Sequence, residues 1–197
     1  MRERVPRQGI ESKKRKKQLK RPLERNYDHL GDKVRIETIT RNLYKYDELT
    51  EQQKQKALDR LYDLNTVCDW WEYIYSDAET VGCSIKEFDV GRGSFCALKL
   101  DKSGLDVAKL VKEHHGESCD TYKAAESYLV ALEALKKATP DDEDLDSEDI
   151  DNDFRRALGE CYLSMLRKEF EYLTSREAIE ETIKANDYEF DENGKLA

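Results

Sequence analysis

The sequence predicts an α+β domain in which a small antiparallel sheet of three to four strands packs against five to six helices. Apolar residues recur at helical spacing in several long segments, while a few short segments alternate with the period of a strand. Turns that contain glycine separate these segments. We assign residues 1–30 to a flexible basic arm and residues 31–197 to a single domain with an acidic loop at 139–153.

The domain is expected to begin with a strand and a helix. Lys33–Thr40 alternates β-branched with charged residues, which predicts a half-buried strand. Thr50 and Gln53 have the spacing of a capping box, so they predict the start of a helix whose apolar stripe begins at Ala57.

A second, aromatic helix is expected from Asn65 or Thr66 to Gly82. Its apolar residues recur at helical spacing and predict a buried face made of Val67, Trp71, Ile74, Tyr75 and Ala78. Trp70 falls beside this face and is expected to be partly exposed. Exposed tryptophans are enriched at binding hot spots, so Trp70 is the candidate aromatic contact to a partner.

A β-hairpin should follow, with strands at Ile85–Val90 and Phe95–Leu100. The connection Gly91-Arg92-Gly93 supplies residues that tolerate a positive φ and exposes Arg92 as a further candidate contact. Glu87 shares a face with Ile85, so either both faces of the first strand are partly covered or a bulge intervenes.

The remaining elements are mainly helical. Ser103 predicts the cap of a short helix that ends near Gly116, and a longer helix is expected from Asp120 to Ala138. The most regular apolar stripe predicts a helix over 154–173, and Ser175 is expected to cap a last helix. The final segment, DYEFDENGKLA, predicts a strand that enters an Asn193-Gly194 turn.

Charge is distributed unevenly along the chain. The net charge is −9, but residues 1–23 contain ten Lys or Arg against two Glu. This arm is open to three interpretations, namely contact with nucleic acid, docking onto an acidic protein, or a solvated tail. Its candidate contacts form the run KKRKK: Lys13, Lys14, Arg15, Lys16 and Lys17.

The acidic loop carries nine carboxylates within Asp141–Asp153 and is expected not to pack. It lacks the glycine and the closing glutamate of a calcium-binding loop. A solvated linker and a surface that mimics the phosphate charge of nucleic acid are both compatible with it. The candidate contacts here are Asp141, Asp142, Glu143 and Asp144.

No apolar run is long enough for a membrane helix, and no signal-peptide core follows the basic start. The five cysteines are odd in number and never form a CxxC pair, which favours reduced thiols in or near the core. We therefore expect a cytoplasmic protein with no membrane contact.

Candidate chemistry is sparse. Residues of types that bind metals cluster at one place, namely His114, His115 and Cys119. Adjacent residues on a helix point about 100° apart, so the two histidines do not face one ion. A solvated helix end is the simpler interpretation. The Asp69–Glu72 stretch could suggest a sugar site, and the turn at 91–94 an anion cradle, but neither matches an established motif. We expect no catalytic residues, no metal and no cofactor.

Several segments together resemble a group of small accessory proteins encoded in tailed-phage and prophage genomes: YKYDELTEQQKQKAL, DWWEYIYSDAETVG, FDVGRGSFC, HGESCDTYKAAESYL and YEFDENGKL. The group has no assigned activity, so the resemblance transfers no functional residue. It implies an accessory protein of a bacterial virus, a context that favours proteins which bind a host component and block it, including inhibitors of CRISPR and other defence systems.

The leading expectation is a non-enzymatic, phage-encoded protein that occupies a host protein or ribonucleoprotein complex, such as a CRISPR-type defence nuclease, through charged surface. The first alternative is direct nucleic-acid binding through residues 1–23. An unassigned metal-dependent enzyme is the second alternative.

Overall fold

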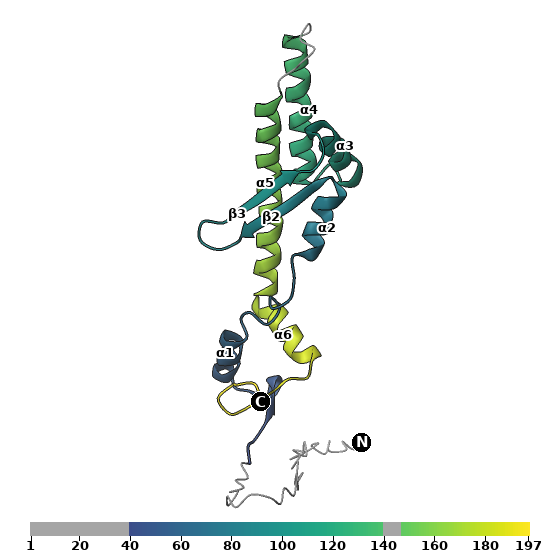
Figure 1. Ribbon diagram of the computed structural model, residues 1–197. Coiled ribbons are helices and arrows are strands. Elements are labelled where there is room, and N and C mark those ends of the chain that lie inside the picture. Colours follow the sequence, from purple (N-terminus) through teal and green to yellow (C-terminus); the bar gives the residue numbers. More distant parts are fainter. Residues whose placement is uncertain (1–39, 140–146) are drawn as a thin grey trace, which may run out of the picture. The chain divides into compact units, whose positions relative to one another are not determined.

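The computed structural model describes residues 40–139 and 147–197. The basic arm at 1–30, nearly all of the strand expected at Lys33–Thr40 and the acidic residues 141–146 lie outside the described residues. The elements are, in chain order, β1 (Tyr44–Lys45), the 3-10 helix η1 (Tyr46–Glu48), α1 (Glu51–Arg60), α2 (Glu72–Thr80), β2 (Cys83–Asp89), β3 (Phe95–Leu100), α3 (Gly104–His114), α4 (Asp120–Ala138), α5 (Glu148–Leu173), α6 (Arg176–Ala185) and β4 (Glu189–Phe190) (Figure 1). The predicted α+β class, with antiparallel strands and packed helices, is confirmed.

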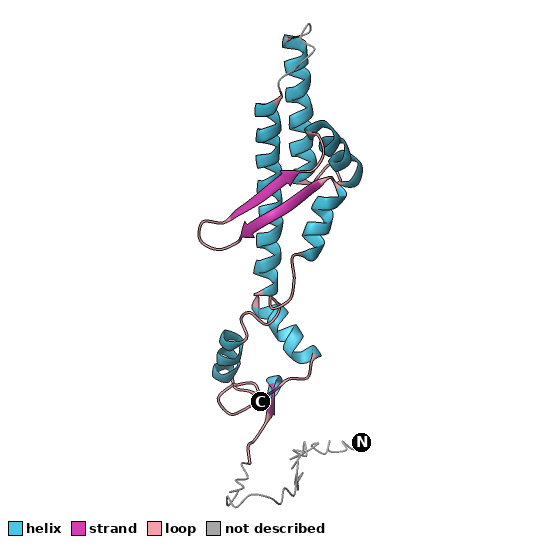
Figure 2. Ribbon diagram, in the orientation of Figure 1, coloured by secondary structure: helices cyan, strands magenta, loops and turns pink. Residues whose placement is uncertain are grey.

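The four described strands are divided between two antiparallel pairs, β1–β4 and β2–β3 (Figure 2). In the hairpin, Cys83 lies opposite Leu100 and Asp89 opposite Phe95. Its register shifts between Ile85 and Glu87. A bulge is therefore present in this strand, which is one of the two alternatives that the sequence allowed. The second pair joins the two ends of the described chain, because Tyr44 in β1 lies opposite Phe190 in β4.

Local capping explains where several helices begin. The side chains of Thr50, Ser103 and Ser175 each accept a hydrogen bond from a backbone N–H in the first turn of α1, α3 and α6. Such bonds satisfy donors that have no partner inside the helix. All three predicted caps are confirmed, and α4 has the predicted bounds.

The predicted start of the second helix is wrong, because residues 61–71 form turns and bends and α2 begins at Glu72. The Asn65 amide donates to the carbonyl of Leu173 at 3.0 Å and accepts from the Thr182 hydroxyl at 2.8 Å. These bonds hold Asn65 in a non-helical turn. Val67, assigned to the buried face, is therefore 78% exposed, whereas Trp71 is half-buried against the core.

The last long helix begins earlier than its apolar stripe indicates, since α5 starts at Glu148. Acidic residues in its first turn complement the positive end of the helix dipole. Asp151 is only half-exposed and accepts hydrogen bonds from Tyr128 at 2.6 Å and from Ser147 at 3.0 Å. Part of the acidic segment that was expected not to pack therefore belongs to the fold.

The larger hydrophobic core surrounds α5, and Figure 1 shows the β2–β3 hairpin lying across this helix. Leu158, Tyr162 and Leu166 of α5 are fully buried and pack with residues of α2, α3, α4 and the hairpin. The helix α5 is therefore the element on which the other parts of this core are assembled.

A smaller hydrophobic cluster is built from η1, α1, α6 and β4. Tyr46 contacts Phe190 edge to face, with ring centroids 6.1 Å apart, and its hydroxyl donates to Glu180 at 2.9 Å. Desolvation acts to raise the pKa of Glu180, but hydrogen bonds from Arg176 and Tyr46 outweigh it and lower the pKa. This charged carboxylate therefore helps to hold α6 against η1.

Candidate functional site

The sequence-predicted contacts do not converge within the described residues. Lys13–Lys17 and Asp141–Asp144 lie outside them. Trp70 is half-buried and packs against the rings of Trp71, Phe88 and Phe170 at 5.5, 5.8 and 5.7 Å. Arg92 is exposed in the turn between β2 and β3.

The structure instead assembles a surface from residues 62–73 and the carboxyl end of α5. The Tyr73 hydroxyl donates to Glu169 at 2.9 Å, the Trp70 ring packs on Phe170, and Asn65 bonds to the Leu173 carbonyl. These three links fix the segment to the last turns of the helix.

Apolar and acidic side chains are exposed together on this surface. Val67, Tyr73 and Tyr172 are 78%, 57% and 57% exposed. We define the acidic–aromatic surface as Val67, Asp69, Glu72, Tyr73, Glu169 and Tyr172. Tyr62 and Asp63 are exposed on the same segment.

The segment that contains residues 62–73 carries charge of one sign, although Arg167 and Lys168 adjoin Glu169 on α5. Residues 61–85 contain five carboxylates and no Lys, Arg or His. Over residues 40–197 there are 21 Lys and Arg against 37 Asp and Glu, a net charge of −16. The resulting negative potential attracts basic partners and repels acidic ones.

The hydrogen bond to Glu169 orients the phenol of Tyr73. Partial burial, together with the hydrogen bond to Glu169, raises the pKa of Tyr73 to about 12. The ring therefore presents a flat apolar face whose orientation is set before any partner arrives, and this lowers the entropic cost of binding.

The sequence interpretation missed this surface for two reasons. Val67 was assigned to the core, and Tyr73 and Tyr172 fall outside the apolar stripes that were used to find helices. The absence of basic residues from 61 to 85 was visible in the sequence and would have drawn attention to the segment.

His115 was expected at a solvated helix end, and that prediction is wrong, although His114 is exposed. The His115 side chain is only 9% exposed, and its Nδ1 lies 2.6 Å from the Thr121 hydroxyl. Its Nε2 is 3.3 Å from a carboxylate oxygen of Asp77, a distance suited to an ion pair but without hydrogen-bond geometry. The other oxygen of Asp77 accepts from Tyr162 at 3.0 Å.

Asp77, His115 and Thr121 have the composition of an acid–base–nucleophile set. Thr121 is fully buried, however, and neither described pocket reaches it. The network therefore joins α2, α3, α4 and α5 inside the fold. Among the described residues no group of three or more His, Cys, Asp or Glu side chains is arranged to hold a metal ion.

The five cysteines are free thiols, as expected, but the prediction that they lie in or near the core is wrong for Cys68 and Cys119, which are exposed. Cys83 is buried, and Cys96 and Cys161 are half-buried. Burial raises the pKa of Cys83 to about 12 and that of Cys96 to about 11. The thiols of Cys83 and Cys96 are therefore protonated at neutral pH, which makes them poor nucleophiles.

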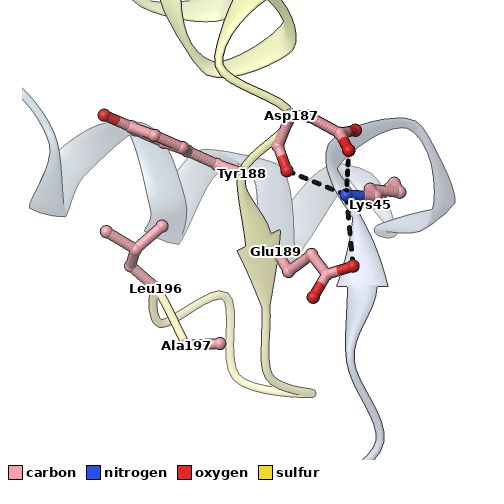
Figure 3. Close-up of a pocket in the computed structure, with 6 residues that line it drawn as sticks. All are labelled: Lys45, Asp187, Tyr188, Glu189, Leu196 and Ala197. Atoms are coloured by element: carbon pink, nitrogen blue, oxygen red, sulfur yellow. Dashed lines mark hydrogen bonds and ion pairs between the residues drawn. The ribbon is translucent and has the colours of Figure 1, made fainter. Parts of the chain in front are cut away.

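A pocket of about 510 Å³ lies beside the β1–β4 pair (Figure 3). The Lys45 ammonium in it lies 2.8 Å from the Asp187 carbonyl, 2.8 Å from the Asp187 carboxylate and 3.1 Å from Glu189. Three oxygens match the three N–H donors of an ammonium group. This lysine therefore links β1 to Glu189 of β4 and to Asp187 through exposed contacts, and it has no donor left for a ligand.

No protein-family model, curated protein or solved structure matches the chain. Within 40–139 and 147–197, no helix has the length and apolar character needed to cross a membrane.

Proposed function

We propose that this protein is a non-enzymatic binding protein that occupies a basic surface of another macromolecule and thereby blocks it. The acidic–aromatic surface is the observation that supports this function, since it combines two exposed tyrosines, of which Tyr73 is oriented by Glu169, with a stretch that lacks basic residues. Tyrosine is enriched at the hot spots of protein interfaces, and opposite charge accelerates association.

In its more specific form, the proposal is that the protein is encoded by a bacterial virus and acts on a host protein or ribonucleoprotein complex. The resemblance to phage accessory proteins supports this origin. A carboxylate-rich surface competes with phosphates for the same Lys and Arg side chains. The target class we propose is therefore the nucleic-acid-binding surface of a defence nuclease of the CRISPR type.

The test compares wild type with the double variant Tyr73→Ala/Tyr172→Ala and with Val130→Ala, which removes an equally exposed apolar side chain from α4. Each protein is immobilised and exposed to lysate from a bacterium that carries such a nuclease. We expect wild type and Val130→Ala to retain the same complex, and the double variant to retain at least tenfold less. Thermal melting checks that all three proteins are folded.

The retained complex is then purified, and its binding to nucleic acid is measured with and without saturating protein. The proposal requires that the protein reduces this binding. Equal retention of the complex by the double variant, or unchanged nucleic-acid binding, contradicts it.

Direct nucleic-acid binding through residues 1–23 is the second candidate, favoured by the ten Lys and Arg in that segment. Labelled DNA and RNA are titrated at two salt concentrations with the full chain and with a chain that lacks residues 1–23. Direct binding should weaken steeply with salt and disappear on deletion, because it depends on counterion release.

A further inference from the structure

A groove of about 370 Å³ lies between β3 and α5, and it shares no residue with the acidic–aromatic surface. Its lining includes three apolar side chains, Phe95, Leu98 and Leu163. Gly159 lets the two elements approach closely, because a Cβ atom at this position would lie 3.1 Å from the carbonyl oxygen of Cys96. The groove is therefore shallow, with a partly apolar floor.

Arginines border this groove. Arg155 and Arg156 line it, and Arg167 donates a hydrogen bond to Ser94 where β3 begins. The Arg155 guanidinium lies 3.4 Å from Asn152, and that of Arg156 lies 3.3 Å from Asp153. Long, exposed contacts of this kind contribute little, so both guanidinium groups remain available to a ligand.

The sign of the charge here is opposite to that of the surrounding chain. From residue 155 to residue 168, α5 carries four basic side chains and one Glu, whereas residues 40–197 have a net charge of −16. The rest of residues 40–197 repels negative charge. The groove therefore favours a short ligand whose negative groups all lie within the groove.

We propose that this groove is a docking site for a short acidic segment of a partner protein. Its carboxylates pair with Arg155 and Arg156, since guanidinium groups bind carboxylates through two parallel hydrogen bonds. An apolar side chain of the segment covers Phe95 and Leu163, since Leu98 is only 5% exposed and belongs to the core. This adds a second docking site, of opposite charge preference, to the function proposed above.

Nucleic acid fits the groove less well. Its lining contains Glu160 and a single aromatic residue, Phe95, which is 41% exposed. Sites for single strands usually present several aromatic platforms along a continuous basic track. A nucleic acid long enough to extend beyond the groove is also repelled by the negative potential of the surrounding surface.

The experiment selects ligands for the full chain from a display library of random dodecapeptides. We expect the selected peptides to be enriched in Asp and Glu next to apolar residues. Binding of a labelled selected peptide is then measured for wild type, for Arg155→Glu/Arg156→Glu and for Lys136→Glu/Lys137→Glu. The last variant is the matched control. It reverses the charge of two exposed basic residues that are also consecutive in the sequence but lie on α4.

We expect the arginine variant to bind at least tenfold more weakly and the lysine variant to bind like wild type. A labelled random single-stranded DNA of twelve nucleotides is titrated in parallel. Failure to enrich any peptide, enrichment of peptides without acidic residues, or equal binding by the arginine variant overturns the proposal. Tighter binding of the DNA through the same arginines also overturns it, because the groove is then a nucleic-acid site. Thermal melting confirms that each variant is folded, and none of these outcomes depends on the acidic–aromatic surface.

Discussion

Replacing Gly194 or Gly93 by alanine separates two effects, namely backbone strain at a positive φ and overlap of the added Cβ atom with its neighbours. Both have a positive φ, +70° at Gly194 and +85° at Gly93. A Cβ at Gly93 has no neighbour within 4 Å, whereas a Cβ at Gly194 would lie 2.5 Å from the carbonyl oxygen of Gln53 in α1. Replacement by alanine therefore strains the backbone at both sites but creates an overlap only at Gly194.

The expected magnitudes follow from these surroundings. An L-residue in the left-handed region costs about 1–2 kcal/mol, which is the whole expected effect of Gly93→Ala. Overpacking adds about 1–3 kcal/mol at Gly194, because a backbone carbonyl inside a helix cannot rotate away as a side chain can. We therefore expect Gly194→Ala to lower the free energy of unfolding by about 2–5 kcal/mol.

Urea unfolding followed by far-UV circular dichroism measures both variants. The comparison requires an unchanged slope of free energy against urea, which indicates that the surface exposed on unfolding is the same. Equal losses for the two variants would show that the turn at Gly194 moves freely away from α1. That result would refute the packing of the last residues against this helix.

Three further predictions concern the core and its polar contacts. Leu158→Ala should lower the free energy of unfolding by about 3–5 kcal/mol, because this side chain is fully buried, whereas Val130→Ala at an exposed position of α4 should change it by less than about 0.5 kcal/mol. Similar melting of the two variants contradicts the assigned core. Tyr128→Phe should cost about 1–3 kcal/mol, since it leaves the half-buried Asp151 carboxylate without its 2.6 Å donor, and a wild-type urea midpoint would argue against that bond. The lowered pKa of Glu180 contributes stability that is present above the ordinary value of 4.5 and lost as the pH falls through the folded value. When the pH is lowered below 4.5, the free energy of unfolding should therefore fall less for Glu180→Gln than for wild type. Parallel plots of this free energy against pH would show that Glu180 makes no such contribution.

Features that depend on neighbours in the sequence could be predicted. The caps at Thr50, Ser103 and Ser175 and the bounds of α4 follow from local hydrogen bonds and apolar spacing. Features that depend on distant partners could not. Asn65 stops the expected helix because it bonds to Leu173 and Thr182, and neither partner is visible from its own segment.

The same distinction applies to the candidate surface. Trp70 was correctly expected to be partly exposed, but its position follows from Phe88 and Phe170, which come from β2 and α5. The pairing of Tyr73 with Glu169 depends on how residues 62–73 meet the end of α5. Long-range packing of this kind has no signature in the local pattern of one sequence.

The pairing of β1 with β4 has a consequence for the order of folding. Tyr44 and Phe190 are 146 positions apart, and closing a flexible loop of that length costs about 4 kcal/mol, against about 1.6 kcal/mol for Asp89 and Phe95, which are six positions apart. The core around α5 is made of elements that follow one another along the chain, so its assembly brings the distant ends together before they pair. We therefore expect the smaller cluster to form last and to open first, with faster amide hydrogen exchange in β4 than in the β2–β3 hairpin.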